Sequence, residues 1–117
     1  MIRPSNGSIK VYLYCEPVDM RKQIDGLAAI VELEMQLKPF TKSLFVFTNK
    51  RKDKLKILCW EKNGFVVWYK RLEKNTFHWF KGSDNPNISV RELNFLLDGY
   101  DIFNFKPHAP VFVASTA

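Results

Sequence analysis

Residues 44–79 read LFVFTNKRKDKLKILCWEKNGFVVWYKRLEKNTFHW, and the predicted fold is built around this segment. Apolar and polar side chains alternate along it in short runs separated by turns, which is the pattern of half-buried strands. Four strands are predicted, over residues 44–48, 55–60, 65–72 and 77–80. Connections this short join only antiparallel neighbours, so the pattern predicts a β-meander.

The turn at Asn63-Gly64 predicts which side chains share a face of this sheet. Asn-Gly is the strongest signal for a two-residue hairpin turn, because type I′ geometry needs positive φ at both central positions. Lys62 then pairs with Phe65, and the register of the hairpin follows from this pair. One face carries the core side chains Leu55, Ile57, Cys59, Val66, Trp68 and Leu72, with Lys70 as its only charge. The other face carries Lys56, Leu58, Trp60, Lys62, Phe65, Val67, Tyr69 and Arg71.

The chain on either side of this sheet predicts one more strand and two helices. Residues 9–15 alternate as a strand, and Asp19 is expected to cap a long helix with an apolar stripe. Gly26 in that helix is expected to allow a close approach to the sheet. The sequence from Ser89 to Glu92 has the form of a capping box that begins a short helix, and Gly99 supplies its stop. The predicted fold class is therefore α+β, an antiparallel meander of four to five strands with one long N-terminal and one short C-terminal helix.

Length and composition predict one domain. With 117 residues, of which 46% are hydrophobic, the chain can bury a core. We assign residues 1–105 to a single domain and residues 106–117 to a tail that either adds an edge strand, packs on a partner or stays mobile. Cys15 and Cys59 lack ligand-like spacing and indicate a reducing compartment. The sequence shows neither a signal peptide nor an apolar membrane span, so a cytoplasmic protein is expected.

Positive charge is concentrated in the region that forms the sheet. Between Lys50 and Lys81, ten lysine and arginine residues stand against three acidic residues, a net charge of +7, whereas the whole chain carries +6. The rest of the chain is therefore close to neutral. A cationic region of this kind fits a polyanionic partner such as nucleic acid.

The candidate nucleic-acid-binding residues come from one loop and two strands of the predicted sheet. They are Lys50, Arg51, Lys52 and Lys54 in the loop, and Lys56, Trp60, Tyr69, Lys70 and Arg71 on the strands. Cations beside aromatic rings suit a single strand, because phosphates meet the charges and bases stack on the rings. The alternative is that the first helix covers Trp60 and Tyr69 while the lysines extend into solvent.

Side chains that would carry catalysis or hold a metal are sparse. Neither His78, in a predicted strand, nor His108, in the tail, has a cysteine or second histidine at ligand spacing. The five glycines are scattered singly, so no phosphate-binding glycine loop is present. Asp19, Asp25 and Asp53 could form the acidic trio of a two-metal nuclease, but a helix cap, a helix surface and a lysine-rich turn explain them more simply. We expect no enzymatic activity, no metal and no cofactor.

Several short motifs occur in order along the chain. They are Asp19-Met20-Arg21-Lys22, Asp25-Gly26-Leu27, Leu44-Phe45-Val46-Phe47-Thr48-Asn49-Lys50-Arg51, Leu55-Lys56-Ile57-Leu58-Cys59-Trp60, Asn63-Gly64-Phe65 and Tyr69-Lys70-Arg71-Leu72-Glu73. Together they resemble the TnpB-type accessory proteins of bacterial insertion sequences, which are encoded beside the transposase and are unrelated to the RNA-guided nuclease of the same name. The resemblance covers about residues 2–100 and departs from the family's pattern at Asn75, where glycine is common, and at Phe80, where proline is common.

The resemblance implies a role in DNA transposition alongside a separate transposase, without a catalytic activity of the protein's own. It supplies no residue roles. Two functions therefore stay open: a non-catalytic factor that binds DNA through the basic loop and sheet, and a protein-interaction module that binds the transposase or a sibling accessory protein without contacting DNA.

Overall fold

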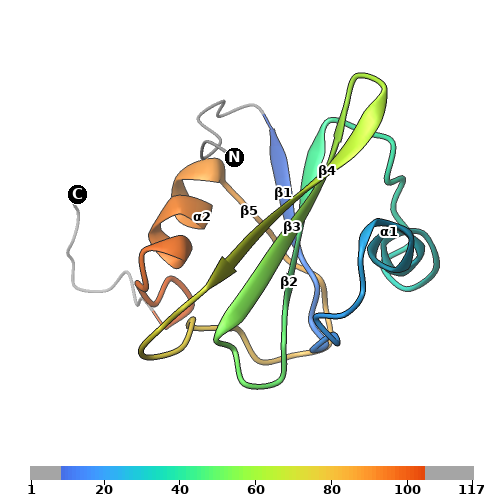
Figure 1. Ribbon diagram of the computed structural model, residues 1–117. Coiled ribbons are helices and arrows are strands. Elements are labelled where there is room, and N and C mark those ends of the chain that lie inside the picture. The colour runs from blue at the N-terminus through green and yellow to red at the C-terminus, as the bar shows by residue number, and fades with distance from the viewer. Residues whose placement is uncertain (1–8, 105–117) are drawn as a thin grey trace.

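The computed structural model describes residues 9–104, which form a five-stranded mixed sheet with one helix on each face (Figure 1). The strands are β1 (Lys10–Leu13), β2 (Ser43–Thr48), β3 (Lys54–Glu61), β4 (Gly64–Arg71) and β5 (Asn87–Ile88), in the sheet order β4-β3-β2-β1-β5. The helices are α1 (Ile24–Leu33) and α2 (Val90–Leu97). The predicted tail, residues 106–117, lies outside the described residues.

The predicted purely antiparallel meander is wrong, because β1 and β2 are parallel neighbours. Lys10 pairs with Ser43 and Leu13 with Val46, and α1 lies in the connection between the two strands. The pairs β2–β3 and β3–β4 are antiparallel as predicted, and β5 adds an antiparallel edge beside β1. Short turns join β2 to β3 and β3 to β4, so they determine the antiparallel direction of these three strands alone. A long connection leaves strand direction open, and here it forms a crossover.

Helix α1 is also shorter than predicted, with ten residues, and it does not begin at Asp19. Its N-cap residue is Gln23, which makes no side-chain capping bond. Asp19 instead caps a separate turn, in which the Arg21 backbone N–H donates to Asp19 Oδ1 at 2.8 Å. The neighbour closest to Gly26 is Lys22 and not the expected sheet, since a Cβ there would lie 3.3 Å from Cβ and Cγ of Lys22.

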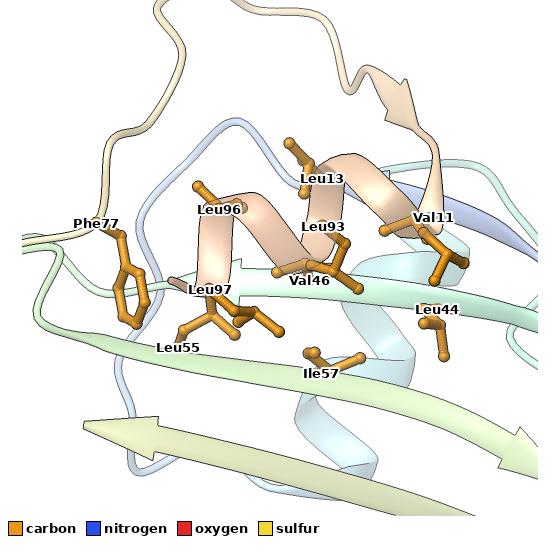
Figure 2. Close-up of a cluster of buried hydrophobic side chains, with 11 residues drawn as sticks. Val11, Leu13, Leu44, Val46, Leu55, Ile57, Phe77, Leu93, Leu96 and Leu97 are labelled. Atoms are coloured by element: carbon orange, nitrogen blue, oxygen red, sulfur yellow. The ribbon is translucent and has the colours of Figure 1, made fainter. Parts of the chain in front are cut away.

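The sheet has an apolar cluster on each face. The cluster beneath α2 (Figure 2) consists of Val11, Leu13, Leu44, Val46, Leu55, Ile57, Phe77, Val90, Leu93, Leu96 and Leu97. The cluster beneath α1 consists of Tyr14, Val18, Leu27, Val31, Met35, Phe45, Phe47 and Leu58. Because α1 and α2 lie on opposite faces, the central strands β2 and β3 contribute side chains to both clusters.

The predicted capping box at the start of α2 is confirmed. The Glu92 backbone N–H donates to Ser89 Oγ at 3.0 Å, and the Ser89 backbone N–H donates to Glu92 Oε1 at 2.9 Å. Gly99 follows the helix with φ +95°, and its N–H donates to the Leu96 carbonyl oxygen at 3.0 Å. These bonds satisfy backbone groups that the helix ends leave without intrahelical partners.

The β3–β4 hairpin turns one residue earlier than predicted. Lys62 and Asn63 form the tip, and Glu61 pairs with Gly64. Lys62 has φ +56°, and the Asn63 N–H donates to the Glu61 carbonyl oxygen at 2.6 Å, a three-residue γ-turn. The register differs from the predicted one by two residues. An even shift leaves every side chain on its predicted face, so Trp68 packs on the α2-side cluster as expected.

The predicted strand over residues 77–80 is wrong, because this segment packs as coil. Phe77 is only 1% exposed and belongs to the α2-side cluster, and its N–H donates to the Lys52 carbonyl oxygen at 2.7 Å. Trp79 donates its indole N–H to the Tyr14 carbonyl oxygen at 3.3 Å. His78 lies in the same coil, 3.6 Å from the Asp101 carboxylate, and is not the sheet residue that was predicted. The apolar side chains of residues 77–80 therefore reflect packing against the core and not pairing in the sheet.

Candidate nucleic-acid interface

The basic loop consists of residues 49–53 between β2 and β3 together with Lys54, the first residue of β3, and the side chain of Asn49 organises it. Its Oδ1 accepts the backbone N–H groups of Asp53 and Lys54, both at 3.1 Å, and its Nδ2 donates to Asp53 Oδ1 at 2.7 Å. This last bond lowers the pKa of Asp53 below its ordinary value, with a smaller contribution from the positive charge of Lys54. The loop backbone is therefore fixed by its own hydrogen bonds, a role for Asn49 that sequence analysis missed.

The Asp19–Lys22 motif lies against this loop. The Val18 backbone N–H donates to the Thr48 carbonyl oxygen at 2.9 Å. From β3, Lys56 Nζ donates to the backbone carbonyls of Met20, at 2.9 Å, and Lys22, at 2.8 Å. These bonds join the segment that precedes α1 to the sheet, although Lys56 is more than 30 positions from both residues in sequence.

A groove of about 600 Å³ lies between the two segments. We call it the motif groove, and it is lined by Pro17, Val18, Asp19, Met20, Arg21, Asn49, Lys50, Arg51, Lys54 and Tyr69. Four of these residues are cationic and one is acidic. The acidic residue, Asp19, is already paired with Arg21 at 2.6 Å between Oδ2 and Nη2, so the cations of the basic loop provide the excess positive charge.

The Asp19–Arg21 pair stays charged at any physiological pH. The side-chain hydrogen bonds from Arg21, followed by the bond from its backbone N–H, lower the pKa of Asp19 to about 2. The same pairing raises the pKa of Arg21. The Arg21 side chain is 92% exposed, so its guanidinium remains accessible to solvent although the Asp19 carboxylate binds it.

The structure brings four of the predicted site residues together in the motif groove: Lys50, Arg51, Lys54 and Tyr69. Lys52 lies in the same loop, with φ +61°. Arg71 pairs with Lys54 across the strands, and its Nε is 3.0 Å from Glu73 Oε2. The ammonium of Lys56 binds the backbone carbonyls of Met20 and Lys22 in the Asp19–Lys22 motif. Arg21, which sequence analysis did not select, joins the set, and its place in the Asp-Met-Arg-Lys motif was the available signal.

Trp60 and Lys70 lie away from the groove. Trp60 packs edge-on against Phe40 and Phe65, with 5.0 Å between ring centroids in each pair. Lys70 is on the other face of the sheet, where its Nζ donates to the Leu97 carbonyl oxygen at 2.8 Å. The alternative in which the first helix covers Trp60 and Tyr69 is wrong for Tyr69, which is 49% exposed. Trp60 is half-buried, but the rings against which it packs, Phe40 and Phe65, lie outside α1.

Lys70 has a structural role at the end of α2, and this gives a first prediction. Changing Lys70 to methionine keeps the apolar stem but removes the ammonium that binds the Leu97 carbonyl, where the helix dipole favours a cation. We expect the free energy of unfolding to fall by about 1 kcal/mol, measured by urea denaturation, with DNA affinity unchanged. The exposed Lys74→Met variant is the control for the lost charge. A loss of DNA affinity specific to the Lys70 variant would contradict the structural assignment.

Within residues 9–104, no three His, Cys, Asp or Glu side chains gather closely enough to hold a metal ion. None of the helices in this range has the length and apolarity needed to cross a membrane.

Comparison with known proteins identifies the family. The family model described as IS66 Orf2 like protein matches residues 9–107. Two relatives from Sinorhizobium fredii are named only as uncharacterized proteins. One, y4jC, is 32% identical over 86% of this chain and 86% of its own length, and the other, y4hO, is 30% identical over 84% and 86%. No solved structure matches the chain. The matched range includes the motif groove and the whole sheet, and the chain belongs to the IS66 Orf2-like family of accessory proteins of insertion-sequence transposition.

Proposed function

We propose that this protein is a non-catalytic, cytoplasmic accessory factor that binds DNA through phosphate contacts in the motif groove. The observation that carries the proposal is the convergence of the Asp19–Lys22 motif and the basic loop on one groove with excess positive charge. Lysine and arginine contacts to phosphates release counterions and supply most of the sequence-independent affinity for DNA. Such contacts position a protein on DNA but do not read its sequence.

The fixed backbone of the basic loop supports this function. Asn49 already holds the loop through three hydrogen bonds, and Lys52 is tied to Phe77 through its carbonyl oxygen. Binding therefore has to order side chains but not the loop itself, which lowers the entropic cost of association.

The test is a titration of a labelled duplex with the purified protein at salt concentrations from about 50 to 200 mM. We expect the logarithm of the association constant to fall linearly with the logarithm of the salt concentration, because each neutralised phosphate releases counterions. Binding that does not depend on salt, or that is absent both for this duplex and for its separated single strand, would reject a role in DNA binding.

A second function, binding of the transposase or a sibling accessory protein, is favoured by an exposed aromatic group. Phe40 is 62% exposed and contacts Trp60 and Phe65, with ring centroids at 5.0 and 5.3 Å. These rings lie near the β3–β4 turn, at the end of the sheet opposite the basic loop (Figure 1). Exposed aromatic rings are enriched at protein interfaces. A retention experiment separates the two functions: the purified protein is immobilised, and the amounts of DNA and of transposase that it retains are compared.

Asp19 provides a further prediction, because its carboxylate is the one acidic group that lines the groove. Asp19→Asn keeps an oxygen that accepts the Arg21 backbone N–H but frees the guanidinium for phosphates. We expect DNA affinity to rise a few-fold at low salt, measured by fluorescence anisotropy. Since the pKa of Asp19 is about 2, lowering the pH of the wild type to about 5 should not produce the same gain through this residue. Weaker binding by a stably folded Asn variant would show that the carboxylate itself is needed.

A further inference from the structure

Tyr69 is the aromatic ring that the motif groove leaves open. It is 49% exposed and lines the groove together with Lys50, Arg51 and Lys54. Trp60, the other ring predicted to stack on bases, is engaged by two neighbouring rings and does not line the groove. An open ring beside several cations is the combination by which proteins bind single-stranded nucleic acid, through stacking and phosphate contacts.

The ring of Tyr69 is held in place by Lys56. The two residues pair directly across β3 and β4, and Lys56 Nζ lies 5.6 Å from the ring centroid. The ammonium is itself fixed by the backbone carbonyls of Met20 and Lys22. The ring is therefore positioned by a cation–π contact and by its strand before any ligand arrives, which favours a flat ligand that needs a preformed platform.

We propose that the motif groove binds an unpaired nucleotide of single-stranded DNA, with its base stacked on the face of the Tyr69 ring that Lys56 does not occupy and its flanking phosphates beside Lys50, Arg51 and Lys54. The proposal rests on the proposed function, since it requires DNA in this groove, and it adds the form of that DNA. A base inside a duplex is stacked on its neighbours and has to be extruded before a side chain can reach its face. Single strands and unpaired strand ends are thus the preferred ligands, with little dependence on sequence because every base has a π-face.

The test compares one labelled oligonucleotide as a single strand and as a blunt duplex. Tyr69→Ala should weaken binding of the single strand by roughly 5- to 150-fold and leave binding of the duplex nearly unchanged. Tyr69→Phe, which keeps the ring, should behave as wild type. Tyr100→Ala is the matched control, because Tyr100 is 61% exposed and does not line the groove.

A second measurement reports stacking directly. A fluorescent adenine analogue in the single strand should be quenched on binding to the wild type and to Tyr69→Phe, but not on saturation with Tyr69→Ala. Thermal unfolding of each variant shows whether it is folded.

The outcomes separate the stacking proposal from the proposed function. If folded Tyr69→Ala binds the single strand as tightly as wild type, or loses single strand and duplex equally, the stacking proposal is overturned while binding of DNA by the wild type stands. If the wild type binds neither form, both proposals fail. Selective loss of the single strand, together with loss of quenching, supports both.

Discussion

Changing Lys50, Arg51, Lys52 and Lys54 together to alanine should abolish most of the salt-dependent binding of DNA. These four side chains belong to the basic loop, whose backbone is fixed by Asn49. Three of them line the motif groove. Each phosphate contact that is lost should flatten the dependence of log K on log salt by ~0.9 for a duplex. The loss should be similar for unrelated sequences, because phosphate contacts do not read bases.

The matched control removes the same charge elsewhere. Lys10, Lys38, Lys42 and Lys74 are exposed and do not line the motif groove. Their combined change to alanine lowers the net charge equally, so any difference between the two variants reports the position of the charge. Equal binding by the loop variant and the wild type, or equal losses in the two variants, would mean that the basic loop is an ordinary solvated turn.

Changing Phe77 to alanine should destabilise the protein far more than removing the Lys70 ammonium does. The side chain is 1% exposed within the α2-side cluster, so its removal leaves a cavity between the coil, the sheet and α2 (Figure 2). Truncations of this kind cost about 3–5 kcal/mol, a large part of the roughly 5–15 kcal/mol typical of a folded domain. Urea unfolding followed by tryptophan fluorescence measures the change.

Phe95→Ala is the control for this substitution. Phe95 lies on α2 but is 40% exposed, so the same atoms are removed without opening a cavity in the core. Its loss should be well below that of Phe77→Ala. A Phe77 variant no less stable than the Phe95 variant would show that the segment over residues 77–80 is not part of the core.

Much of the fold follows from local sequence. The alternation from Leu44 to Arg71 predicted β2, β3 and β4, and short turns made them antiparallel. The faces of the hairpin were correct despite a turn misplaced by one residue, since the register moved by two. The capping box at Ser89 was also predictable, because both of its hydrogen bonds join residues three positions apart.

The candidate site was only partly predictable for the same reason. The cations of the basic loop are close together in sequence, so their joint position followed from the sequence alone. Their meeting with Arg21 did not, because it depends on Val18 bonding to β2 and on Lys56 reaching across to the Met20 and Lys22 carbonyls. The role of a single lysine could not be predicted from its charge. Lys70 and Lys50 carry the same charge, but Lys70 binds the Leu97 carbonyl at the end of α2.

Local sequence was enough to predict the strands from β2 to β4, their faces, the capping box of α2 and the concentration of positive charge between Lys50 and Lys81. Each of these depends on side-chain period or on bonds between residues close in the chain. Three features became visible only in the folded chain: β1 runs parallel to β2, Phe77 enters the core without a strand, and Asp19, Arg21 and Tyr69 share a groove with the basic loop. These features depend on contacts between distant segments, and such contacts form only when both faces of the sheet find apolar cover.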